Sequence, residues 1–170
     1  MLFSVGGDGT FLEAASFLGW SDVPMLGVNM GRLGFLAEVP AGGVSRALRA
    51  LREGNYEVEE RTMLEVDVDG EWNEELGYAL NEVGVRRTDT SSLLRIGVRV
   101  DEEEVATYWA DGLLVATSTG STAYSMSCGG PIVWPTCDAL LLTPVCPHNL
   151  SMRPLVLPSD VTVRLDVESR

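Results

Sequence analysis

A glycine turn near the start of the chain limits the folds that this sequence can adopt. The turn spans residues 6–10 (Gly-Gly-Asp-Gly-Thr), follows the apolar run 1–5 and opens a helical stretch that we expect from Thr10 to Leu18, with Thr10 as its cap. Where a strand passes through glycines into a helix, the backbone can approach an anion and the first-turn N–H groups point at it. The pattern predicts an α/β layer with a phosphate-binding turn made by Gly6, Gly7, Gly9 and Thr10.

Asp8, inside this turn, favours phosphoryl transfer over binding alone. A carboxylate beside bound phosphate repels it, unless the carboxylate holds Mg²⁺ or takes a proton from a nucleophile. The alternative is a tight turn in which Asp8 only satisfies helix N–H groups. The sequence contains no lysine and no Gly-x-Gly-x-x-Gly, so a P-loop, a protein-kinase strand lysine and the dinucleotide fingerprint are all excluded.

The composition excludes several further classes of protein. The formal net charge is −13 and all 12 basic residues are arginine, so the surface repels nucleic acid and anionic membranes. No apolar run reaches the roughly 18 residues of a membrane span, and no charged-then-apolar leader occurs. With three cysteines, no Cys-x-x-Cys and one histidine, neither a zinc site nor a disulfide framework is expected. We expect a cytoplasmic protein that binds neither nucleic acid nor membranes.

The periodicity of the sequence divides the chain into two predicted domains. Residues 1–54 alternate strand and helix, with a helix ended by Gly19, a strand over 23–28 and a second helix over 44–51 ended by Gly54. Residues 55–170 are mainly β, with strands expected over 64–68, 96–100, 105–109, 113–116, 140–143 and 161–167, and one short helix over 123–128. The chain is therefore expected to be a parallel sheet with helices, followed by a sandwich-like β domain.

Two further segments in the second half are typical of ligand binding. Residues 117–125 carry six Ser or Thr hydroxyls among nine positions, which predicts a second loop for an anion and a ribose; the alternative is an N-capped, closely packed helix. Asn81 offers a donor and an acceptor for a base edge or ribose, and Glu82 can accept two ribose hydroxyls or hold a metal. The alternative for this pair is a polar end of an apolar strand.

Taken together, these segments resemble the NAD kinase family. The resemblance covers nearly the whole chain and rests on motifs that occur in the family's order: residues 6–10, Asn29-Met30-Gly31-Arg32-Leu33-Gly34-Phe35-Leu36, Asn81-Glu82, Ala110-Asp111-Gly112, residues 119–125, Gly129-Gly130-Pro131 and Arg153-Pro154. Ser118 stands where the family usually has Pro, and Cys128 where it commonly has Ala. The family also has segments before and after this region, so we expect a partial chain that lacks both ends.

The resemblance implies a reaction and a set of roles. The reaction is transfer of the γ-phosphate of ATP, with Mg²⁺ carried by the ATP, to the 2′-hydroxyl of the adenosine ribose of NAD. Asp8 is implied as the general base, with Asp111 at the nicotinamide end of a dinucleotide bound by a neighbouring subunit, and hence a homo-oligomer, a dimer or tetramer. The other residues implied to bind NAD are Gly9, Phe35, Asn81, Glu82, Thr119, Thr122, Ala123, Tyr124 and Ser127.

Two other functions share parts of this pattern. A diacylglycerol or sphingosine kinase has the same Gly-Gly-Asp-Gly turn, but a basic, membrane-facing patch would be expected and the chain has no basic cluster. The second is a non-catalytic nucleotide-binding module. Measuring NAD binding and turnover separates the three functions. Binding with turnover indicates an NAD kinase, binding without turnover favours the module, and no response to NAD excludes both of these.

Overall fold

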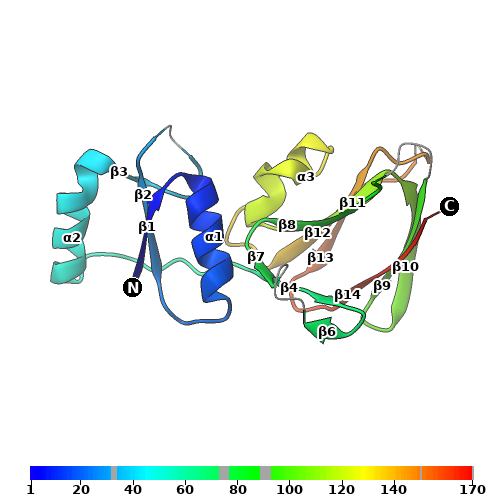
Figure 1. Ribbon diagram of the computed structural model, residues 1–170, viewed down its shortest axis with the longest axis horizontal. Coiled ribbons are helices and arrows are strands. Elements are labelled where there is room, and N and C mark those ends of the chain that lie inside the picture. Colours follow the sequence, from blue (N-terminus) through cyan, green and yellow to red (C-terminus); the bar gives the residue numbers. More distant parts are fainter. Residues whose placement is uncertain (32–33, 73–76, 89–92, 150, 170) are drawn as a thin grey trace. The chain divides into compact units, whose positions relative to one another are not determined.

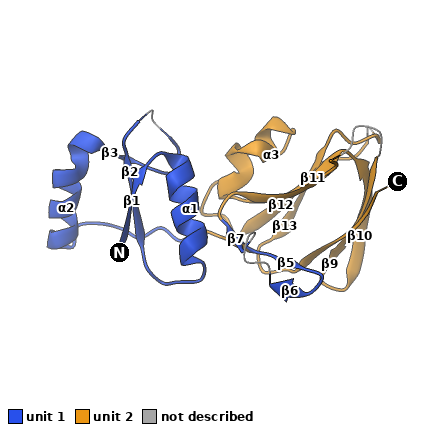
Figure 2. Ribbon diagram, viewed as in Figure 1, with its two compact units in different colours: residues 1–60, 65–79 blue, residues 61–64, 80–170 orange. Residues whose placement is uncertain are grey.

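The computed structural model describes residues 1–31, 34–72, 77–88, 93–149 and 151–169, which form two compact units. Unit 1 comprises residues 1–60 and 65–79, and unit 2 comprises residues 61–64 and 80–170 (Figure 2). Unit 1 thus extends past residue 54, where the periodicity places the domain boundary. Arg32 and Leu33, which belong to one of the family motifs, lie outside the described residues.

Unit 1 contains the expected parallel sheet with helices. Strands β1 (Leu2–Gly6), β2 (Met25–Asn29) and β3 (Val39–Pro40) pair in that order and in parallel. Helices α1 (Asp8–Leu18) and α2 (Val44–Glu53) lie on opposite sides of this sheet (Figure 1), and the short 3-10 helix η1 (Ala41–Gly43) leads into α2. Gly54 ends α2 with a left-handed φ of 72°, as predicted, because glycine adopts this conformation without a Cβ penalty.

Helix α1 begins earlier than the sequence analysis expected. Gly7 is its N-cap, with an extended φ of −101°, and no side chain caps the helix. The prediction of Thr10 as the cap is therefore wrong, because Thr10 lies inside the first turn and its side chain occupies the space that a Cβ at Gly6 would need. The predicted stop is confirmed, since the Gly19 N–H donates to the Ala15 carbonyl oxygen at 3.1 Å.

Unit 2 is built from two antiparallel sheets, as the β pattern predicted. One has the order β13-β12-β11-β8 and the other β10-β9-β14. Alternate side chains such as Ile96, Val98 and Tyr108 are buried between them. The strands are β8 (Glu82–Arg86), β9 (Leu94–Val100), β10 (Glu103–Ala110), β11 (Gly112–Thr117), β12 (Ala139–Val145), β13 (Leu155–Pro158) and β14 (Val163–Ser169).

Short elements complete the chain. The predicted strand 64–68 is interrupted at Val66, whose N–H bonds the Gly77 carbonyl at 3.0 Å. Asp69 and Gly70, both with positive φ, turn β5 into β6, which is the Asp-Gly signature of a tight hairpin. No helix within the described residues is long and apolar enough to cross a membrane. The short elements are β4 (Leu64–Glu65), β5 (Asp67–Val68), β6 (Glu71–Trp72), β7 (Tyr78–Ala79), η2 (Thr119–Thr122) and α3 (Tyr124–Ser127).

Candidate functional site

The carboxylate of Asp8 binds a loop of unit 1 that lies far along the sequence. Its Oδ2 accepts the Phe35 N–H at 2.8 Å, and its Oδ1 accepts the N–H groups of Leu36 and Ala37 at 3.1 and 3.2 Å. The interpretation of Asp8 as a cap for the N–H groups of its own helix is therefore wrong, since no side chain caps α1. Asp8 instead joins the glycine turn to the loop 35–37.

These contacts decide the charge of Asp8. Partial burial raises its pKa, but the three N–H hydrogen bonds together outweigh burial, so the net pKa lies below the ordinary value of 3.8. Asp8 is consequently ionised at neutral pH. A carboxylate can accept about four hydrogen bonds. Three N–H groups already donate to the Asp8 carboxylate, so it can accept one further hydrogen bond, for example from a substrate hydroxyl.

Gly34 and Phe35 complete this part of the site. A Cβ at Gly34 would collide with the Asp8 carboxylate, so only glycine allows the loop to approach it this closely. The side chain of Phe35 is 80% exposed, although its backbone is held by Asp8, which leaves the ring available to a ligand. The sequence analysis gave Gly34 no role of its own; its place beside Phe35 was the only local signal.

The glycine turn leaves open backbone where the sequence analysis expects phosphate. A Cβ at Gly7 or Gly9 would meet no atom within 4 Å, so both backbone segments are accessible. Gly6 is different, because the Thr10 side chain covers it. The N–H groups at the start of α1 follow directly, and a helix start of this kind favours an anion.

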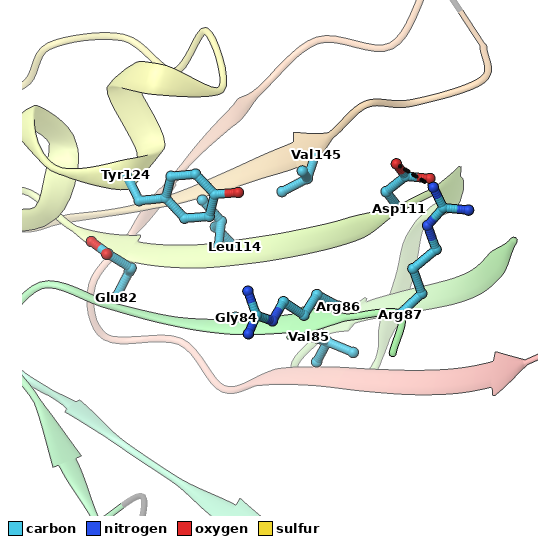
Figure 3. A pocket seen from close by; sticks show the side chains of 9 residues that line it. All are labelled: Glu82, Gly84, Val85, Arg86, Arg87, Asp111, Leu114, Tyr124 and Val145. Atoms are coloured by element: carbon cyan, nitrogen blue, oxygen red, sulfur yellow. Dashed lines mark hydrogen bonds and ion pairs between the residues drawn. The ribbon is translucent and has the colours of Figure 1, made fainter. Parts of the chain in front are cut away.

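Unit 2 contains a pocket of about 450 Å³ that brings together three residues singled out by the sequence analysis, Glu82, Asp111 and Tyr124 (Figure 3). They come from β8, from the turn before β11 and from the start of α3. The remaining residues of the lining were not predicted from the sequence; they are Gly84, Val85, Arg86, Arg87, Leu114 and Val145. Alternation along β8 was the available signal for two of them, since Gly84 and Arg86 share a face with Glu82.

Glu82 is the most unusual side chain of this pocket. Burial raises the pKa of its carboxyl above the ordinary value of 4.5, and a hydrogen bond from the Tyr124 backbone opposes this only in part. Its Oε2 is buried and has no hydrogen-bond partner. Because an unpaired buried oxygen lowers folding stability, the Oε2 of Glu82 is suited to accept a hydrogen bond from a ligand hydroxyl.

We expect Glu82→Gln to stabilise the ligand-free protein more at pH 8 than at pH 4.5. A raised pKa in the folded state means that Glu82 opposes folding once it ionises, so its cost is absent below the ordinary pKa and appears as the pH rises through the folded-state pKa. For a chain of this size, each kcal/mol of unfolding free energy corresponds to about 2–4 °C in the unfolding midpoint. Thermal unfolding at both pH values measures it. Glu103→Gln, which alters an exposed carboxylate, is the control; equal differences at the two pH values would contradict the prediction.

The opposite end of the pocket is neutralised internally. The Arg87 guanidinium and the Asp111 carboxylate form an ion pair at 3.0 Å, drawn as a dashed line in Figure 3. The backbone reinforces the pair, because the Arg87 N–H donates to the Asp111 carbonyl at 2.9 Å. Both side chains are about 30% exposed, so the pair is accessible to a ligand from the pocket.

The hydroxyl-rich loop 117–125 has a different role from the one expected. The side chains of Thr117, Ser118, Ser121 and Ser125 are buried, and their hydroxyls bond inside the protein. Ser118 donates to the Cys137 carbonyl at 2.7 Å, and Ser125 pairs with the Thr143 hydroxyl at 2.7 Å. The prediction of a ligand-binding hydroxyl cluster is wrong for these four residues, because they hold the loop onto β12 and its neighbours.

The other predicted residues of unit 2 are not among the residues that line this pocket. The Asn81 backbone contacts the loop closely, since a Cβ at Gly120 would collide with the Asn81 carbonyl, and Thr117 N–H donates to that carbonyl at 2.8 Å. The Thr119 hydroxyl accepts a hydrogen bond from Arg61 at 3.2 Å. Three further residues follow on the loop and on α3: Thr122, Ala123 and the exposed Ser127.

Both halves of the chain match known protein families. Residues 1–56 match the ATP-NAD kinase N-terminal domain, and residues 80–170 match the ATP-NAD kinase C-terminal domain. An NAD kinase from Flavobacterium johnsoniae is 48% identical over 172 residues, and one from Cytophaga hutchinsonii is 42% identical over 170 residues. Each alignment covers 100% of this chain and 58% of the relative, so the chain spans somewhat more than half the length of these proteins.

Solved structures show the same likeness. The structure of yeast NADH kinase in complex with NADH superposes with a TM-score of 0.87 at 34% sequence identity, over 99% of this chain and 52% of that one. An NAD kinase from Archaeoglobus fulgidus in complex with ATP superposes with a TM-score of 0.80 at 30% identity, over 98% of this chain and 64% of that one.

Proposed function

Since the chain belongs to the ATP-NAD kinase family, we propose that it acts as an NAD kinase, which transfers the γ-phosphate of ATP to the 2′-hydroxyl of the adenosine ribose of NAD and so forms NADP. The observation that carries this proposal is the ordered match of both family domains along one chain. The names of the relatives, NAD kinase, and the NADH and ATP of the two structural neighbours support the same reaction.

Asp8 acts as the general base in this proposal. Its carboxylate is ionised, and it has room to accept one more hydrogen bond, from the ribose 2′-hydroxyl. A low pKa makes Asp8 a weak base, but the loose transition state of phosphoryl transfer needs little proton removal before the phosphoryl group arrives. The three N–H groups of residues 35–37 hold the carboxylate in one orientation, which supplies the positioning that this chemistry requires.

The phosphates of ATP bind, in this proposal, at the open backbone of Gly7 and Gly9 and at the first turn of α1. A divalent cation, Mg²⁺, enters with ATP as part of the substrate and neutralises charge on the phosphates. Gly6 and Thr10 shape the turn, since the Thr10 side chain covers Gly6 and leaves its neighbours bare.

In this proposal the dinucleotide is bound by the residues that the family resemblance assigns to it. Glu82 accepts ribose hydroxyls with its unpaired oxygen, Asn81 contacts the adenosine, and the exposed faces of Phe35 and Tyr124 border the bound molecule. Asp111 faces the nicotinamide end of a dinucleotide bound by a neighbouring copy, so the protein works as a homo-oligomer in this proposal. Its place of action in the proposal is the cytoplasm. The loop residues Gly9, Thr119, Thr122, Ala123 and Ser127 complete the proposed binding set.

Turnover and binding measured together test the proposed function. We expect NAD to raise the thermal unfolding midpoint and NADP to form only when NAD and ATP are both present. A rise with NAD and no NADP would favour a non-catalytic nucleotide-binding module. No response to NAD, together with phosphorylation of a diacylglycerol or sphingosine, would instead favour a lipid kinase.

A further inference from the structure

Strand β8 presents two charged side chains to the same pocket. Glu82, Gly84 and Arg86 are every second residue of β8, so they lie on the same face of the strand. The Cα atoms of Glu82 and Arg86 are roughly 13 Å apart along the strand. Gly84 between them has no side chain, and a methyl group of Leu114 occupies the position that a Cβ would take there. The pocket therefore has an apolar floor, and the residues at the two ends of β8, Glu82 and Arg86, both line it.

The two arginines of this pocket differ in their charge balance. Arg87 is paired with Asp111, whereas Arg86 forms no ion pair with any residue in the described part of the chain. Figure 3 shows the Arg86 side chain pointing along β8 towards the end that carries Glu82, away from the Arg87–Asp111 pair. An uncompensated cation and an unpaired carboxylate oxygen thus share one pocket.

We infer that Arg86 binds a phosphate group of the nucleotide whose ribose hydroxyls lie against Glu82. This inference rests on the proposed function and adds a residue that neither the motifs nor the family match assigns. A ribose carries hydroxyl donors for Glu82 and phosphate esters for Arg86, so a ribose phosphate provides both partners from one small group. The ester can be the 5′-phosphate that leads into the dinucleotide or the 2′-phosphate of the product.

The negative charge of the chain makes the Arg86 guanidinium important for binding a phosphate. The net charge is −13, and the pocket lining includes two carboxylates, one of which Arg87 neutralises. Without Arg86 the remaining charge of Glu82 would repel a phosphate. A guanidinium is suited to the task, because it stays charged and its planar fork can hold two phosphate oxygens at once.

Binding of three ligands to the 170-residue chain tests the inference. Adenosine, adenosine 5′-monophosphate and adenosine 2′-monophosphate are titrated against the unchanged protein, Arg86→Gln and Arg86→Lys. Arg164→Gln is the matched control, because it removes the charge of an exposed arginine on β14 that does not line the pocket. Thermal unfolding confirms that each variant is folded.

We expect Arg86→Gln to bind at least one of the two monophosphates about 10-fold more weakly and to bind adenosine as the unchanged protein does. Arg86→Lys should recover part of the loss, since it keeps the charge without the fork. The monophosphate that loses affinity identifies which phosphate Arg86 contacts. Equal affinities of Arg86→Gln and the unchanged protein for both monophosphates would overturn the inference, yet leave the proposed function standing if adenosine binds. No binding of any ligand would overturn both.

Discussion

Replacing Asp8 with asparagine is expected to lower kcat for NADP formation by at least about 100-fold, measured at saturating NAD and ATP. Asparagine has nearly the same shape but cannot accept the proton of the ribose hydroxyl. The Leu36 and Ala37 N–H groups can still bond its oxygen, whereas the Phe35 N–H then faces an amide donor. The loss of that one bond costs about 1 kcal/mol of folding stability, so the variant stays folded at 25 °C and its KM for NAD changes little.

A second variant separates chemistry from loop anchoring in this experiment. Gly34→Ala keeps the Asp8 carboxylate but forces the loop away from it, because the new Cβ would collide with the carboxylate oxygens. Its unfolding midpoint should fall further than that of Asp8→Asn, while its kcat falls less. Near-normal turnover by Asp8→Asn, with the same fall in stability, would make Asp8 a structural residue that only joins the turn to residues 35–37.

Replacing Glu82 with alanine is expected to raise the KM for NAD by about 5- to 150-fold, because ribose hydroxyls would then be buried without a partner, at about 1–3 kcal/mol. Steady-state kinetics at saturating ATP measure it, and kcat should change much less. The stability of the ligand-free protein should change little, because the variant removes a buried oxygen that has no hydrogen bond as well as the hydrogen bond from the Tyr124 backbone.

The stability measurement distinguishes this role from a purely structural one. If Glu82 were simply a polar strand end, Glu82→Ala would lower the unfolding midpoint and leave the KM for NAD where it was. Glu103→Ala on β10, also a strand glutamate but exposed and outside the pocket, should change neither quantity.

The elements that the sequence predicted well are those set by local chemistry. Gly19 and Gly54 end their helices because their backbones adopt positive φ, a property of the residue itself. The alternation expected over 96–100 is seen in β9, where the buried Leu94, Ile96 and Val98 alternate with more exposed residues, again a local property. The short strands β3, β6, β7 and β13 were not predicted, since two to four residues carry too little periodicity.

The site divides in the same way. The sequence alone determined that a carboxylate lies in a glycine turn at a helix start and that Asn81-Glu82 is a polar pair next to apolar strand residues, because these are neighbours along the chain. Only the tertiary structure decided what those groups contact. The partners of Asp8 lie 27 to 29 residues away, and the hydroxyls of 117–125 bond carbonyls and Thr143 up to 37 residues away. Alternation along β8 is local and places Arg86 on the same face as Glu82, whereas the Arg87–Asp111 pair depends on the long-range pairing of β8 with β11.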